Sequence, residues 1–89
     1  RPDPLPRAAF AVDVNVGKLA RLLRMAGLDT WYDPGLGQAE LAKRVAKERR
    51  ILLSRSRDIL KRSNINYGHL IRARQPREQL SEVIRLYGL

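Results

Sequence analysis

Four acidic side chains stand where short apolar segments end or where helical patterns begin. They are Asp13, Asp33, Glu40 and Asp58. Carboxylate oxygens are the ligands that Mg²⁺ and Mn²⁺ prefer, and a metal ion held in this way can direct a water molecule at a phosphodiester. If these acids converge, the chemistry that they suit is metal-dependent hydrolysis of a nucleic-acid backbone. Their spacing forms no compact metal motif, so the fold would have to bring them together.

Short apolar runs between breaking residues predict the strands that would position these acids. We expect strands at 10–12, 28–32, 51–53 and 69–72. Helical periodicity indicates helices at 16–26, 38–49, 57–61 and 76–87. This alternation predicts a small α/β domain with a mainly parallel four-stranded sheet and helices on both faces. The carboxyl ends of parallel strands meet at one edge, where open α/β sheets bind ligands.

The first strand and helix show this pattern most clearly. The run at 10–12 is typical of a strand that is buried on both faces, and Asp13 falls where the run ends. Asn15 is the expected N-cap of the following helix and Gly27 its terminator. Asp13 would then lie at the ligand-binding edge, although an Asp after a strand often serves only the turn.

The charge balance indicates a polyanionic partner. The 89 residues include 18 Lys and Arg against 9 Asp and Glu, which gives a net charge of +9. No segment suits a membrane span or a membrane-surface helix, so we expect no membrane partner. Cysteine is absent, which is typical of a reducing compartment such as the cytoplasm. The basic residues expected to contact phosphate are Lys18, Arg21, Arg24, Arg55, Arg57 and Lys61.

Structural roles are an alternative for most of these candidates. Glu40 is spaced to pair with Arg44 on a helix surface, and Asp58 suits the start of its helix. Aromatic residues in a small domain are usually needed in its core. We therefore expect packing roles for Trp31 and Tyr32, a structural role for His69 and a turn at Asp29.

A different architecture treats residues 39–62 as a helix-turn-helix that holds duplex DNA. The apolar triplet at 51–53 would interrupt that motif. The parallel α/β sheet is therefore the preferred prediction.

Several segments together resemble the C-terminal ribonuclease domain of the Mut-seven family, a branch of the PIN-like nucleases. These segments are GKLARLLR through GLDT, ILLSR and PREQL, in the family's order and spacing. The resemblance covers about residues 8–89. It implies a PIN-like α/β fold, RNA as the nucleic acid and cleavage supported by Mg²⁺ or Mn²⁺. By position, Asp13 matches the family's first acid and Glu40 its helix acid, while Asp58 and Asp33 would supplement them.

The sequence departs from the family pattern after the third expected strand. Members commonly have Thr, Arg, Asp and Arg there, and this chain has Ser54, Arg55, Ser56 and Arg57. Ser56 therefore replaces an acid. Two functions stay open on one fold; the family resemblance favours the first, which is the preferred prediction, and Ser56 favours the second. The first is a metal-dependent endoribonuclease with Asp13, Glu40 and Asp58 as catalytic acids. The second is an RNA-binding module that has lost its metal cluster.

Residues 1–7 carry three prolines and are expected to form a linker that precedes a domain at 8–89. In some family members a similar linker follows an N-terminal ubiquitin-like domain, so the resemblance implies such a domain in the parent protein. The sequence has no initiator Met, and we expect it to be a piece of a longer chain. Its oligomeric state is not indicated.

Overall fold

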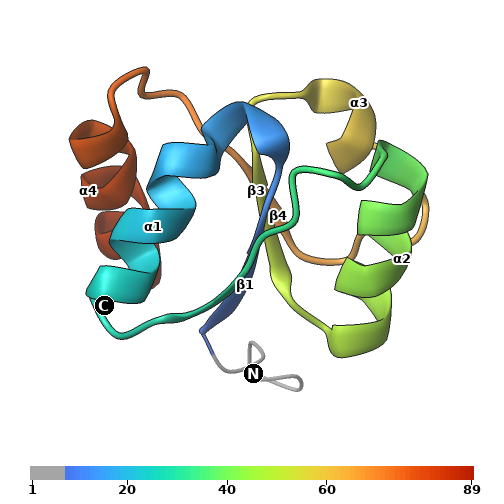
Figure 1. Cartoon of the computed structure of the whole chain (residues 1–89), viewed down its shortest axis with the longest axis horizontal. Coiled ribbons are helices and arrows are strands. Elements are labelled where there is room, and N and C mark those ends of the chain that lie inside the picture. Colours follow the sequence, from blue (N-terminus) through green and yellow to red (C-terminus); the bar gives the residue numbers. More distant parts are fainter. Residues whose placement is uncertain (1–7) are drawn as a thin grey trace.

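The four expected strands form one parallel sheet (Figure 1). In space they follow the order β2-β1-β3-β4, and all three pairings are parallel. The structure, a computed structural model, describes residues 8–89, and the expected linker at 1–7 lies outside the described residues. The last strand begins one residue earlier than the expected 69–72 and ends two residues earlier. The strands are β1 (Ala9–Val12), β2 (Asp29–Trp31), β3 (Ile51–Ser54) and β4 (Gly68–Leu70).

Helices cover both faces of the sheet, as predicted. One face carries α1 (Gly17–Met25) and α4 (Pro76–Tyr87), and a short 3-10 helix, η1 (Val14–Val16), leads into α1. The other face carries α2 (Gln38–Glu48) and α3 (Arg57–Leu60). Strand side chains alternate between faces. Along β3, Ile51 and Leu53 therefore join the core under α1 and α4, while Leu52 joins the core under α2 and α3.

The helix ends confirm the glycine predictions and correct the N-cap. Gly27 and Gly88 follow α1 and α4 with φ angles of 83° and 67°, which lie in the left-handed region that glycine adopts without strain. Asn15 is not the N-cap of α1, because the chain enters η1 directly after β1 and Asn15 lies inside that turn. The extended residue before the turn is Asp13, and its Oδ1 accepts the Val14 N–H at 2.7 Å.

The disfavoured alternative architecture is excluded, and one other expectation is wrong. The helix-turn-helix over 39–62 is excluded, because Ile51–Ser54 pairs with both β1 and β4 in the middle of the sheet. Asp29 is not a turn residue but the first residue of β2, where its carboxylate pairs with Arg50 at 2.9 Å. The packing role of Trp31 and Tyr32 is confirmed, since each ring lies partly buried against one of the two cores.

Candidate nucleic-acid interface

The path of the chain across the sheet reverses between β1 and β3. From β1 the chain passes outward to β2, then returns across β1 to β3 and continues to β4. The carboxyl ends of strands at such a switch point are where open α/β sheets bind ligands. Asp13 directly follows β1 and Ser54 is the last residue of β3, so both residues stand at this point.

Asp13 is buried at the switch point and fully engaged with the protein. Only 4% of the residue is exposed, and its Oδ2 accepts the Ser54 hydroxyl at 2.7 Å. The Ser54 Oγ in turn accepts the Ser56 N–H at 2.9 Å. Each oxygen of the carboxylate thus has a protein donor, because Oδ1 accepts the Val14 N–H. These bonds tie the end of β1 to the end of β3.

Neutral polar groups complete the surroundings of Ser56. The Asn15 side-chain oxygen accepts the Arg55 N–H at 3.2 Å, which links η1 to the segment after β3. Gln38, the first residue of α2, reaches the Ser56 hydroxyl with its side-chain NH₂ at 3.4 Å. Ser56 therefore stands among amides and hydroxyls, at the position where the family resemblance predicted an acid.

Glu40 lies in the first turn of α2 and is exposed on its surface. Its carboxylate lies 3.8 Å from the Lys43 ammonium, whereas Arg44 pairs with Glu48 at 2.8 Å. The predicted pair between Glu40 and Arg44 is therefore wrong. Arg44 instead lies between Glu48, one turn further along α2, and the Trp31 ring, whose centre is 4.9 Å from its guanidinium.

Asp33 and Asp58 each stabilise a local structural element. The Asp33 Oδ1 accepts the Gly35 N–H at 2.9 Å within the turn that precedes α2. Asp58 is exposed in the first turn of α3, a position that favours an acid because of the helix dipole.

A carboxylate cluster for Mg²⁺ or Mn²⁺ is not formed by the described residues. Residues 8–89 contain no group of three or more His, Cys, Asp or Glu side chains that could hold a metal ion. The donors at the switch point are one carboxylate, hydroxyls and amides, and they do not fit a site for a hard dication that needs several charged oxygens. The expected convergence of Asp13, Asp33, Glu40 and Asp58 is thus not present in this structure.

The six basic residues expected at the interface divide between the two faces. Lys18 and Arg21 are exposed on α1, while Arg57 and Lys61 are exposed at the two ends of α3 on the opposite face. Arg24 lies in the last turn of α1, where its Nε donates to the Thr30 carbonyl at 3.2 Å. The six residues therefore do not share one surface.

The Arg55 side chain binds the protein's own backbone. One nitrogen of its guanidinium donates to the carbonyls of Ile71, Arg72 and Ala73 at 3.0 to 3.3 Å. Arg55 therefore holds the segment that follows β4 against the end of β3.

A groove of about 630 Å³ lies between the start of α1 and the start of α4. Lys18 and Arg21 line it from α1, and Arg74 and Gln75 line it from the segment before α4. Sequence reasoning missed Arg74 and Gln75. The signal that was available is the basic run IRARQPR around the helix-starting Pro76.

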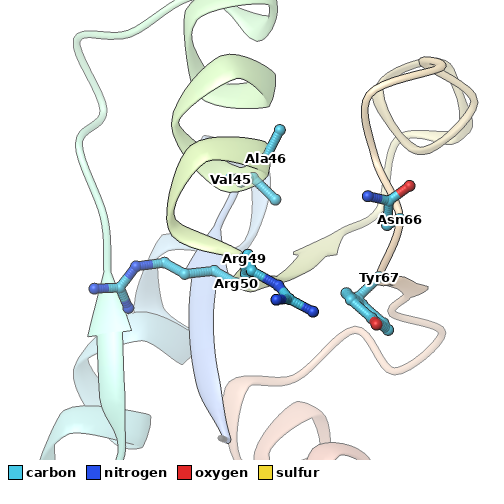
Figure 2. A pocket seen from close by; sticks show the side chains of 6 residues that line it. All are labelled: Val45, Ala46, Arg49, Arg50, Asn66 and Tyr67. Carbon is cyan, nitrogen blue, oxygen red and sulfur yellow. The ribbon is translucent and has the colours of Figure 1, made fainter. Parts of the chain in front are cut away.

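A second hollow, of about 550 Å³, lies on the opposite edge of the sheet (Figure 2). In Figure 2, Asn66 and Tyr67 lie across from the end of α2. Arg50 lines this hollow, and its guanidinium is held by Glu48, by Asp29 and by the Phe10 carbonyl. Burial by itself lowers the pKa of Arg50, but these carboxylates raise it, and the net effect is a raised pKa. Arg50 is therefore a permanent cation that fastens the ends of three elements.

Fold and site together define a small parallel α/β domain with a polar switch point and a strongly basic surface. The family model described as Mut7-C RNAse domain matches residues 8–89, and the chain belongs to this family. Comparisons with curated proteins and with solved structures found no match. Membership indicates a ribonuclease-type, RNA-related function with RNA as substrate or partner. Among residues 8–89, no helix has the length and apolar character needed to cross a membrane.

Proposed function

We propose that this domain is an RNA-binding module built on a ribonuclease fold, and that its switch point no longer supports metal-dependent cleavage. The observation that carries this proposal is the state of Asp13. It is a single buried carboxylate whose oxygens are bonded to Val14 and Ser54, with Ser56 in place of a second acid. A net charge of +9 supports RNA as the partner, because phosphate attraction needs only unpaired cations.

A metal-dependent endoribonuclease is the second candidate, and the retained position of Asp13 at the switch point favours it. In that function Asp13, Glu40 and Asp58 would be the catalytic acids, with Asp33 as a further ligand of Mg²⁺ or Mn²⁺. Glu40 would have to leave Lys43, and Asp58 would have to turn inward from α3. A cytoplasmic location and an N-terminal ubiquitin-like domain remain predictions from the sequence.

Restoring the missing acid tests the proposal. Ser56 stands at the N-cap of α3, a position that Asp favours, so Ser56→Asp should fold normally. The wild type, Asp13→Asn, Ser56→Asp and the double variant Ser56→Asp/Asp13→Asn should each be titrated with Mn²⁺ by calorimetry at low salt. Cleavage of a labelled single-stranded RNA should be followed in parallel, and RNA binding should be measured with EDTA present.

We expect the wild type to bind RNA in EDTA and to show neither Mn²⁺ binding nor cleavage. Ser56→Asp is expected to gain metal binding, and the double variant to lose it again. Cleavage by the wild type that disappears in Asp13→Asn would overturn the proposal in favour of the endoribonuclease. A wild type that does not bind RNA in EDTA would overturn the RNA-binding function itself.

A further inference from the structure

Two adjoining hollows lie along the face formed by α1 and α4. The first, at the starts of the two helices, has a volume of about 630 Å³, and the second has a volume of about 610 Å³. Lys18, Arg21, Gln75 and Pro76 line both hollows, so the two are continuous. We call this continuous surface the α1/α4 groove.

Four cations line the α1/α4 groove and have no acidic partner in the part of the chain that the structure describes. They are Lys18, Arg21, Arg74 and Arg77. Among residues 8–89, no ion pair within 4.0 Å includes any of them. Helix α1 contains no acid, and Glu78 in the first turn of α4 lines neither hollow. Unpaired cations along a groove are what a phosphate backbone requires.

The segment that carries Arg74 is held in place before any ligand binds. Glu82 accepts the Arg72 and Ala73 N–H groups at 2.9 to 3.2 Å. Gln79, which is only 4% exposed, donates to the carbonyls of Ala73 and Arg74 at 3.0 and 3.4 Å. The backbone at Arg74 is therefore already ordered, and only the freedom of its side chain is lost when it binds phosphate.

Aromatic and apolar groups accompany the cations in the α1/α4 groove. Tyr32 lines the groove at the start of α1, and a Cβ atom at Gly17 would lie only 2.5 Å from its hydroxyl. Glycine at position 17 thus leaves room for this ring beside the helix. Met25 lines the other end and is 73% exposed. Surfaces that combine cations with aromatic and apolar groups suit the unstacked bases of single strands.

We propose that the α1/α4 groove binds single-stranded RNA, with Lys18 and Arg21 from α1 and Arg74 and Arg77 from the start of α4 contacting successive phosphates. This inference rests on the proposed RNA-binding function and assigns that function to one face. It adds Arg74 and Arg77 to the interface and leaves α3, with Arg57 and Lys61, outside it.

Three double variants that each remove two positive charges test the proposal. Lys18→Gln/Arg21→Gln neutralises the α1 wall of the groove, and Arg74→Gln/Arg77→Gln neutralises the α4 wall. Lys43→Gln/Lys47→Gln is the matched control on α2, where both residues are exposed. Affinity for a labelled single-stranded RNA should be measured by fluorescence anisotropy between 50 and 200 mM salt, with duplex RNA as competitor. Over about this salt range, binding that depends on phosphate contacts weakens steeply.

Each groove variant is expected to bind RNA about tenfold more weakly at the lower salt concentration, and to lower the salt slope by about 1.4, at about 0.7 for each phosphate contact. The control is expected to keep the wild-type slope. Equal losses of RNA affinity in all three variants would overturn the assignment of binding to the α1/α4 groove, but not the RNA-binding function itself. A wild type that does not bind would instead mean that the proposed function has failed. Preference for the duplex competitor would overturn the single-stranded assignment.

Discussion

The two faces of the sheet (Figure 1) carry similar numbers of basic residues, but the cations of α2 and those of the α1/α4 groove differ in how they are paired. On α2, Lys43 lies 3.8 Å from Glu40 and Arg44 lies 2.8 Å from Glu48. The Arg44 guanidinium also lies 4.9 Å from the centre of the Trp31 ring. The cations of the α1/α4 groove have no such partners among the described residues. Lys47, Arg57 and Lys61 on the opposite face are also in no ion pair within residues 8–89. The α1/α4 groove therefore differs in that four unpaired cations line one groove, whereas the cations along α2 stand beside acids.

The strongest test of this comparison uses the wild-type protein. Lysine acetylation by an amine-reactive reagent should be slowed at Lys18 by bound single-stranded RNA, while Lys43 and Lys47 remain reactive. At RNA concentrations about tenfold above Kd we expect about tenfold protection at Lys18, because only the free fraction reacts. Peptide mass spectrometry measures the three rates. Equal protection at all three lysines would show that the two faces do not differ.

The anchoring of the groove's α4 wall can be tested through Glu82. Burial by itself raises the pKa of Glu82, but hydrogen bonds from the N–H groups of Arg72 and Ala73 and from His69 lower it, and the net pKa lies below the usual value. Such a carboxylate stabilises the fold above its unfolded pKa of about 4.3, and this contribution disappears as the pH falls through the lower folded value.

Glu82→Gln should therefore lower the free energy of unfolding by about 1 to 3 kcal/mol near neutral pH. The difference from wild type should shrink as the pH falls through the folded pKa of Glu82. Urea unfolding at pH values on both sides of this transition measures the effect. The matched control is Glu78→Gln, which is exposed on the same helix. A Glu82 variant as stable as wild type at neutral pH would show that the α4 wall does not depend on this carboxylate.

An acid added to the α1/α4 groove should give one of its cations a partner, as the acids of α2 do for Lys43 and Arg44. Met25 is 73% exposed and lies four residues after Arg21, the spacing at which helical side chains pair. Met25→Glu is expected to weaken RNA binding by about threefold to fivefold, because it offers Arg21 a partner and repels phosphate. Anisotropy at low salt measures the change against Met25→Gln. Identical affinities for the two variants would contradict the importance of pairing.

Removing an acid from α2 is the reverse experiment and should have the smallest effect. Glu40→Gln releases Lys43 from an exposed pair whose side chains are 73% and 61% exposed. Exposed pairs of this kind contribute little, so RNA affinity should rise by no more than about twofold. The same anisotropy assay measures the RNA affinity of Glu40→Gln against that of the wild type. A larger gain would mean that the α2 face binds RNA once its charges are freed, which would weaken the comparison.

Most of the fold could be predicted from local patterns in the sequence. The run at 51–53 became the central strand β3, and Gly27, Pro76 and Gly88 mark helix ends as expected. Each of these features depends on a few neighbouring residues and on their burial. Asn15 was misjudged because the tight entry into η1 moved the capping position back to Asp13.

The candidate site was less predictable, because its contacts join distant residues. Asp13 was expected to face ligand, yet its carboxylate accepts the hydroxyl of Ser54, which lies 41 residues away in the chain. Arg55 was expected to bind RNA, and the structure instead directs its guanidinium to carbonyls 16 to 18 residues further on. The spacing of the acids forms no compact metal motif, so only the fold could decide whether they would meet.

The sequence by itself determined the order of strands and helices, the membership in the Mut7-C family and the large positive charge. These follow from composition, periodicity and motif order, which need no knowledge of long-range contacts. Only the tertiary structure decided which charges are paired and which are free. Arg74 faces the same groove as Lys18 because the segment before α4 folds back beside α1, and Asp13 is bonded because β1 and β3 are neighbours. A side chain's partners depend on what the fold places next to it, and that information is not local.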